Sequence, residues 1–303
     1  MNLQRILNSQ QAGVWALQIS RRLPLGMGLR FSKRVADWIA TKKDLPLVRA
    51  IRLNRWVVSG CKWGTDELDA AVRANLRHIA SSYFVLFHYL SQPELLQKQV
   101  VFSQALDDLI IQTRDSKVKV VVCGVHMSNF DLVLQSAAWR GLRALAISLP
   151  ETSEYNQAVQ WQHQFRRDSG LEILPASLAT FRQAIRRLKA GDTVVTGIDR
   201  PITKPKLRPD FFGRPASLPV HHILIGLEAE APLVLLAATQ EQDGLYHIQS
   251  SEEIQLRRFA DRDQAILWNA SHVLEIAADF IRMKPDQWSI YYPVWPELIE
   301  KMP

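Results

Sequence analysis

The chain has 303 residues and a formal net charge of +7; 47% of its residues are hydrophobic and 22% are charged. These values are typical of a soluble globular enzyme. No apolar run reaches the roughly eighteen residues that a transmembrane helix needs, and the polar N-terminus does not form a secretory signal. The two cysteines, Cys61 and Cys123, are too few for a disulfide framework and suit a reducing cytosol.

The positive charge is concentrated at the N-terminus. Residues 1–63 carry twelve Lys and Arg side chains against Asp37 and Asp44, a balance of 12 − 2 = +10, which leaves −3 for the other 240 residues. Apolar residues, including Trp15 and Trp38, are interleaved with these cations. Basic amphipathic helices that contain tryptophan lie in the headgroup plane of anionic bilayers. We therefore predict that residues 1–63 attach the chain to an anionic membrane surface.

Two other interpretations of this basic segment stay open. It could be the solvated outer face of ordinary packed helices, or it could bind nucleic acid. No DNA- or RNA-binding motif supports the second interpretation, so we expect no nucleic-acid partner.

Helical periodicity dominates the sequence before residue 118. Asp66–Tyr89 repeats apolar residues at helical spacing and begins with acidic residues, as helix N-termini often do. Leu106–Gln112 is a second, shorter candidate. We therefore expect residues 64–117 to be helical, after the basic amphipathic helices of residues 1–63.

The pattern changes at residue 118. Short apolar runs then alternate with amphipathic segments, which predicts an α/β core over residues 118–295, with a mainly parallel sheet flanked by helices. The predicted strands are Val118–Val125, Ala144–Leu149, Leu171–Leu174, Thr193–Ile198, Pro232–Ala238 and Tyr246–Gln249. The predicted helices are Ser128–Arg140, Glu154–Asp168, Leu178–Ala190, Pro219–Ala229 and Ala260–Met283, and Trp288–Trp295 is a predicted edge strand. No linker separates the halves, so we expect one domain over residues 1–303.

The most informative motif is His126-Met127-Ser128-Asn129-Phe130-Asp131, directly after the first predicted strand. Five residues of helix turn through about 500°, so His126 and Asp131 can meet only if the histidine precedes the helix and the aspartate lies in its first turn. Ser128 as N-cap would allow this. The pair could then take a proton from a hydroxyl at neutral pH, which points to an enzyme. The alternative is that Asp131 only favours the helix start.

Other catalytic chemistries have less support. Cys123 and His126 lie three residues apart on a strand and point to opposite faces, so we predict that Cys123 is a core residue. Ser128 is outside a Gly-x-Ser-x-Gly elbow, which does not support a serine hydrolase. His221 and His222 are adjacent and would diverge on a helix, and no Cys or His pair has ligand spacing, so we predict no metal site.

Charged residues further along the chain could bind substrate. Arg166 and Arg167 precede a predicted strand, where they could clamp a phosphate or carboxylate or simply end a solvated helix. Asp199 and Arg200 follow another predicted strand, at the strand end where α/β proteins form sites.

The loop after Arg200 is both basic and aromatic. Its cations suit anionic headgroups or a pantetheine carrier; they are Lys204, Lys206, Arg208 and Arg214. Aromatic residues in a polar loop usually line a pocket or dock on the core, and Phe211-Phe212-Gly213 places two of them here.

Taken in order, these motifs resemble the lysophospholipid acyltransferase superfamily. The matching motifs are His126-x4-Asp131, Arg166-x3-Gly170, Asp199, Phe211-Phe212-Gly213-x2-Ala216-x2-Pro219, Pro232 before a strand and Pro285-Asp286-Gln287-Trp288. The chain is most similar to the branch that holds the late acyltransferases of lipid A biosynthesis and the phosphatidylinositol mannoside acyltransferases. The resemblance extends over residues 47–295.

The resemblance implies transfer of a fatty acyl group from an acyl thioester, on coenzyme A or acyl carrier protein, to a hydroxyl of a membrane lipid or glycolipid. In such an enzyme of the His-x4-Asp type, His126 is the general base and Asp131 orients the imidazole. Backbone N–H groups near Asn129 would meet the developing oxyanion. The predicted substrate-binding residues are Ser128, Asn129, Arg166, Asp199, Arg200, Phe212 and Gly213.

Because no nucleophile lies beside His126, we predict direct attack by the acceptor without an acyl-enzyme, and no cofactor beyond the acyl donor. The expected position is peripheral or monotopic, on the cytoplasmic face of the plasma (inner) membrane. Two alternatives remain on the same fold. One is a non-catalytic module that binds lipid or anions, and the other is an acyl-thioester hydrolase in which His126 activates water.

Overall fold

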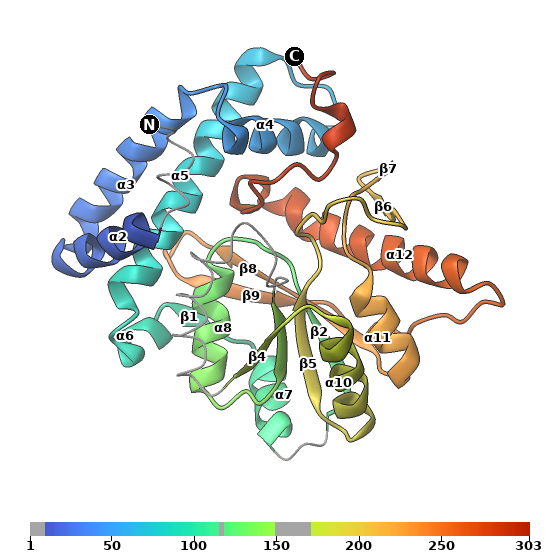
Figure 1. Cartoon of the computed structure of the whole chain (residues 1–303). Helices are drawn as coiled ribbons and strands as arrows, with labels where there is room; N and C mark the ends of the chain where they lie inside the picture. Colours follow the sequence, from blue (N-terminus) through green and yellow to red (C-terminus); the bar gives the residue numbers. More distant parts are fainter. Residues whose placement is uncertain (1–9, 115–117, 149–170) are drawn as a thin grey trace.

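A computed structural model describes residues 10–114, 118–148 and 171–303. Its centre is a seven-stranded sheet in the order β1-β9-β8-β2-β5-β3-β4 (Figure 1). Neighbouring strands are parallel except for the antiparallel pair β8 and β9, which confirms the predicted α/β class with a mainly parallel sheet. The strands are β1 (Val100–Val101), β2 (Val120–Gly124), β3 (Leu145–Ser148), β4 (Glu172–Pro175), β5 (Thr193–Gly197), β8 (Leu233–Gln240) and β9 (Tyr246–Ser250).

Helices cover both faces of the sheet. One face carries α10 (Leu178–Lys189), α11 (His221–Ala229) and α12 (Arg262–Met283), and the other carries α7 (Gln104–Arg114) and α8 (Phe130–Trp139). A separate two-stranded hairpin, β6 (Asp210–Phe211) and β7 (Arg214–Pro215), contacts α12. The N-terminal helices form one side of the molecule in Figure 1; they are α2 (Gln10–Arg22), α3 (Leu25–Ala40), α4 (Pro46–Val58), α5 (Thr65–Tyr89) and α6 (Pro93–Gln97).

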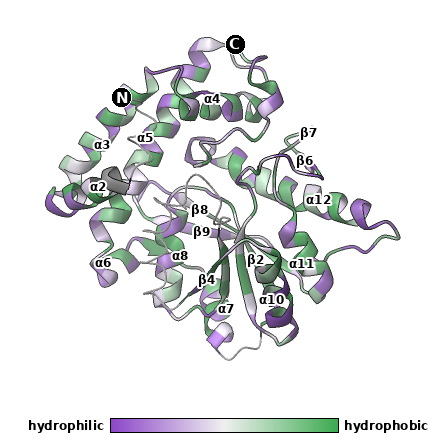
Figure 2. Cartoon of the chain, in the orientation of Figure 1, coloured by the Kyte–Doolittle hydropathy of each residue, from purple (hydrophilic) through white to green (hydrophobic). Residues whose placement is uncertain are grey.

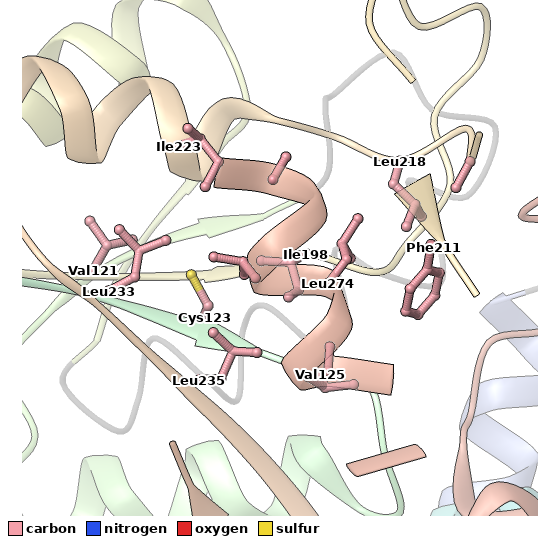
Figure 3. Close-up of a cluster of buried hydrophobic side chains, with 14 of the residues drawn as sticks. Val121, Cys123, Val125, Ile198, Phe211, Leu218, Ile223, Leu233, Leu235 and Leu274 are labelled. Carbon is pink, nitrogen blue, oxygen red and sulfur yellow. The ribbon is translucent and has the colours of Figure 1, made fainter. Parts of the chain in front are cut away.

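Strand β2 shows why the sheet needs cover on both sides. Successive side chains of a strand point to opposite faces, so a continuous run of valines must be covered on both faces of the sheet. On one side, Val121 and Cys123 pack in a cluster with Leu235 of β8, Ile223 of α11 and Leu274 of α12 (Figure 3). This large apolar cluster holds β2 in place, and β2 in turn positions the residues that follow Gly124.

The C-terminal segment differs from the sequence prediction. Trp288–Trp295 is not an edge strand; it lies between two short 3₁₀ helices, η1 (Pro285–Gln287) and η2 (Pro296–Leu298). The reason is a side chain that takes over the role of a partner strand. The Asn54 amide donates to the carbonyls of Ile290 and Tyr292, at 3.1 and 2.8 Å, and its oxygen accepts from the N–H of Val294.

The predicted helix Glu154–Asp168 lies outside the described residues. The other strands and helices predicted from residue 118 onward are present, with ends displaced by a few residues, as is normal for element boundaries. The long helix predicted at Asp66–Tyr89 is α5, and Leu106–Gln112 lies within α7. The expectation of one domain over residues 1–303 stays a prediction.

Helices α2, α3 and α4 pack closely on α5, and α2 and α3 leave apolar side chains exposed. A side chain at Gly28 would overlap the ring of Phe84, so glycine at this position lets α3 approach α5. Figure 2 shows apolar and polar residues mixed along these helices. The exposed apolar side chains on α2 and α3 include Trp15 (65%), Ile19, Met27, Phe31 (54%) and Trp38 (50%). Within the described residues, every helix is too short or too polar to cross a bilayer.

Candidate active site

The register of two neighbouring strands places a histidine against an aspartate. Strands β2 and β5 are parallel, and their final residues, Gly124 and Gly197, are partners. His126 and Asp199 each lie two residues beyond this pair, at the carboxyl edge of the sheet. The imidazole Nδ1 of His126 is 2.5 Å from Oδ1 of Asp199. The ring and its carboxylate therefore meet although 73 residues separate them in sequence.

Asp199 is fully buried and is held through both carboxylate oxygens. Its Oδ2 accepts from the indole N–H of Trp288 at 2.8 Å and from the backbone N–H of His126 at 3.0 Å. A buried ionised carboxylate needs such donors, because it can only accept hydrogen bonds. The same argument assigns the proton on the imidazole: Nδ1 carries the hydrogen that Asp199 accepts, so Nε2 bears the lone pair.

The imidazole is packed on two sides and remains reachable. Its ring contacts Phe130 edge-on, with centroids 4.4 Å apart, and 15% of the side chain is exposed. A side chain on Gly197 would lie 2.5 Å from the Cε1 atom of His126, so glycine at that position makes room for the ring. No other described residue is hydrogen-bonded to Nε2. The arrangement offers a fixed, accessible base at that atom.

The structure corrects the expected partner of the imidazole. We predicted that Asp131 orients the ring of His126, but the carboxylate that holds Nδ1 is that of Asp199. Asp131 is buried in the first turn of α8, whose N-cap is Asn129 rather than Ser128. A carboxylate there is favoured by the positive end of the helix. Spacing along the chain suggested Asp131 as the partner, whereas the register of β2 against β5 places Asp199 beside the ring.

Ser128 and Asn129 are tied to α5 rather than turned to a substrate. Ser128 has a positive φ of 48°, and its hydroxyl lies 2.9 Å from Nε2 of His78. Burial lowers the pKa of His78 to about 4, so this ring is neutral at pH 7. The amide of Asn129 donates to the Ser82 carbonyl at 2.8 Å. The Ser128 N–H donates to the carbonyl of Gln287, so it is not available as an oxyanion donor.

The remaining predicted substrate-binding residues are spread around the site. Arg200 donates to the Tyr292 hydroxyl at 3.1 Å and lies 4.8 Å from the centre of that ring. Phe212 and Gly213 form the turn between β6 and β7, both with positive φ. The centroid of the Phe212 ring lies 6.4 Å from that of Trp288, the residue whose indole donates to Asp199. Arg166 lies outside the described residues.

Cys123 is a core residue, as predicted. It is fully buried among apolar side chains, and this burial raises the pKa of its thiol well above the usual value. Such a thiol is not a nucleophile at neutral pH. Across residues 10–114, 118–148 and 171–303, no group of three or more His, Cys, Asp or Glu side chains is placed to hold a metal ion. The expectation that no cofactor is needed stays a prediction.

Three residues of the site were not recognised as such from the sequence: Gly197, His78 and Trp288. Gly197 ends a predicted strand, and a glycine at that place can signal close approach by another group. Trp288 belongs to one of the motifs quoted above, but its contact with Asp199 depends on the fold. Nothing in the spacing of His78, on a long helix 48 positions before His126, indicates its contact with Ser128.

The sequence matches the family described as bacterial lipid A biosynthesis acyltransferase over residues 3–296. The chain belongs to this family. The resemblance to the lipid A branch is thereby confirmed, and the chain is placed among acyltransferases. No match was found among curated proteins. The family gives the class of reaction, and the geometry around His126 gives the groups that could perform it.

Proposed function

We propose that this protein transfers a fatty acyl group from an acyl thioester to a hydroxyl of a lipid A-type glycolipid at a membrane surface. The observation that carries this proposal is the His126–Asp199 pair at the carboxyl edge of the sheet, with Nδ1 held at 2.5 Å and Nε2 accessible. Family membership supports the same class of reaction. A positioned base of this kind typically contributes about 10²–10⁴-fold in rate.

The reaction would proceed in two steps, attack on the thioester and release of the thiol. First, Nε2 of His126 removes the proton of the acceptor hydroxyl. The hydroxyl oxygen attacks the thioester carbonyl at the same time, which forms a C–O bond and converts the carbonyl oxygen into an oxyanion. Then the oxyanion collapses, the C–S bond breaks, and the leaving thiolate takes the proton from the imidazolium. Asp199 stabilises the imidazolium between these steps and keeps the ring in the required tautomer.

Direct attack by the acceptor is favoured over an acyl-enzyme. The two candidate nucleophiles closest in sequence to His126 are both enclosed. Cys123 lies in the core, and the Ser128 hydroxyl is buried against His78 on α5. Neither can reach a thioester without unfolding its surroundings. Isolation of an acylated form of the protein would contradict this step.

We further propose that α2 and α3 attach the protein peripherally to an anionic bilayer. Phe31 and Trp38 lie seven residues apart on one exposed side of α3, and Met27 is one turn before Phe31. Lys33 and Arg34 are exposed on the same helix. Apolar side chains entering the headgroup layer, with cations beside anionic lipid, would hold the active site next to a lipid acceptor.

The test uses the full-length protein with palmitoyl-CoA, or an acyl carrier protein loaded with the same chain, as donor. The acceptor is O-deacylated lipid A in anionic vesicles, because O-deacylation restores free hydroxyls on that glycolipid. Mass spectrometry should show a product heavier by one acyl chain, formed only with acceptor present. Rapid release of free fatty acid without acceptor would favour a hydrolase. Binding of acceptor without turnover, with either donor, would favour a non-catalytic module.

A further inference from the structure

The carboxyl end of α12 leads into a short segment that pairs with residues 126–128, which we call the catalytic turn. In this segment, residues 285–289, the N–H of Ser289 donates to the carbonyl of His126 at 2.8 Å. In return, the N–H of Ser128 donates to the carbonyl of Gln287 at 2.6 Å. Between these bonds, Trp288 forms an antiparallel bridge with Met127. The catalytic turn is therefore paired with residues 285–289, and the side chain of Trp288 points to Asp199.

Two neighbouring elements hold residues 285–289 in place. The amide of Asn75, on α5, donates to the carbonyls of Asp286 and Trp288 at 2.7 and 2.8 Å. The amide of Gln287 pairs with both backbone groups of Gln240 at the end of β8, at 2.8 and 2.9 Å. Trp288 is thus fixed from the helical side and from the sheet, and it has little freedom to move away from Asp199.

A second tryptophan shows that the bond to Asp199 is more than a consequence of burial. Trp295 belongs to the same aromatic cluster, with ring centroids 6.5 Å from Trp288, and both rings contact Phe211. Both tryptophans are almost completely buried. The indole N–H of Trp295 has no hydrogen-bond partner, whereas that of Trp288 donates to Asp199 at 2.8 Å. The two indoles share one aromatic cluster, and only that of Trp288 is hydrogen-bonded to Asp199.

We propose that Trp288 is a positioning residue for acyl transfer, whose indole N–H fixes the Asp199 carboxylate so that its other oxygen holds the imidazole of His126. This inference rests on the proposed function of His126 as the base. Oδ2 accepts from Trp288 and from the backbone N–H of His126, while Oδ1 faces Nδ1 of the ring, so loss of the indole N–H would leave Oδ2 with the backbone donor alone. The N–H also takes up part of the carboxylate charge, which sets how strongly Asp199 attracts a protonated ring.

The first test compares Trp288→Phe with Trp295→Phe in the transfer assay described above. Both changes remove the same indole volume from one cluster, but only the first removes a hydrogen bond to Asp199. We expect Trp288→Phe to lower kcat by about ten- to hundredfold with KM changed by less than about twofold. Trp295→Phe should leave both kcat and KM near wild type.

A double-mutant comparison separates action through Asp199 from packing. In an Asp199→Asn background, the further change Trp288→Phe should alter kcat by less than about twofold, because the group on which Trp288 acts is already gone. Equal losses in the two tryptophan variants, or an unchanged loss in the Asp199→Asn background, would overturn the proposal. If Trp288→Phe does not fold, a benzothienyl analogue placed at position 288 replaces the N–H by sulfur and keeps the ring volume.

A readout without turnover distinguishes failure of this inference from failure of the proposed function. In ¹⁵N-histidine-labelled protein, the Nδ1–H proton of His126 should give a downfield resonance that disappears in His126→Gln. Trp288→Phe should shift or broaden this resonance, and Trp295→Phe should not. An inactive wild type that shows this difference would refute acyl transfer but keep the effect of Trp288 on Asp199 and the His126 ring. If the wild type is active and the His126 resonance is the same in Trp288→Phe, only the positioning role is refuted.

Discussion

Nδ1 of His126 lies 2.5 Å from Oδ1 of Asp199, and the two residues follow strands that are adjacent in the sheet. Neither side chain needs an unusual backbone to reach the other, since each lies two positions beyond the paired glycines Gly124 and Gly197. The carboxylate is buried and the imidazole is partly exposed. This relationship places a stabilising charge behind the base and leaves the opposite nitrogen for a substrate.

Asp199→Asn should reduce transfer by about 10²–10⁴-fold, because an amide cannot stabilise the imidazolium and can donate to Nδ1, which favours the wrong tautomer. The loss should appear in kcat, measured with saturating donor and acceptor. The exposed Asp210→Asn serves as the control, and thermal unfolding should show that both variants fold. A folded Asp199→Asn protein with nearly normal kcat would remove Asp199 from the mechanism.

Gly197→Ala should impair catalysis far more than Gly124→Ala, although the two glycines are partners across β2 and β5. A methyl group at Gly197 would lie 2.5 Å from Cε1 of His126, whereas the nearest atom to one at Gly124 is 3.9 Å away. The ring must therefore move in the first variant only. We expect kcat to fall at least about tenfold for Gly197→Ala, since small displacements of a catalytic group are costly. Equal rates for both variants would contradict this geometry.

Acid should destabilise the fold through two partly buried histidines, His78 and His221. Burial lowers the pKa of His78 and of His221 to about 4, from the ordinary value of 6.5. The unfolded chain then binds more protons than the folded one between these pH values. The stabilisation is complete above about pH 6.5 and is lost as the pH falls toward 4, by about 3 kcal/mol for each histidine.

Urea unfolding at pH 7 and pH 5 measures this effect. His221→Gln should reduce the loss of unfolding free energy between the two pH values by about 2 kcal/mol, because one of the buried groups no longer titrates. His272→Gln, at an exposed position, should leave the loss as it is in wild type. A pH dependence that is the same in all three proteins would show that burial of His221 does not govern its protonation.

Charged substitutions on α3 should release the protein from anionic vesicles. Replacing Phe31 and Trp38 together by Glu removes two exposed apolar side chains and adds negative charge, so vesicle affinity should fall by more than about tenfold. Ile111→Glu on α7 is a matched control, since Ile111 is 53% exposed and Phe31 is 54% exposed. Added salt should weaken wild-type binding, because surface attraction is screened. Equal affinities for the two variants would place the membrane contact elsewhere.

Periodicity was enough to predict most of the α/β core. The valine run of β2 and the amphipathic repeats of α10 and α12 each carry their own signal, because burial on both sheet faces and on one helix face leaves a direct pattern. The error at Trp288–Trp295 has a specific cause. The apolar residues there suggest a strand, but their backbone groups are satisfied by the side chain of Asn54, from a helix more than 230 positions earlier.

The site, too, could be predicted only in part from the sequence. His126 was predictable because it follows a buried strand, and Asp199 was noticed for the same reason. Their contact was not predictable, since it depends on the register of β2 against β5, and the nearer Asp131 offered a simpler local partner. His78 and Trp288 contact the catalytic turn from segments far along the chain. Such contacts leave no trace in the spacing of residues around the motif.

The most direct test of this account is the rate of acyl transfer by His126→Gln, measured with acyl thioester and O-deacylated lipid A beside wild type. Glutamine keeps a polar side chain of similar length but cannot accept and return a proton. We expect a folded protein whose kcat is lower by about 10²–10⁴-fold. A folded His126→Gln protein that transfers acyl groups at close to the wild-type rate would contradict it.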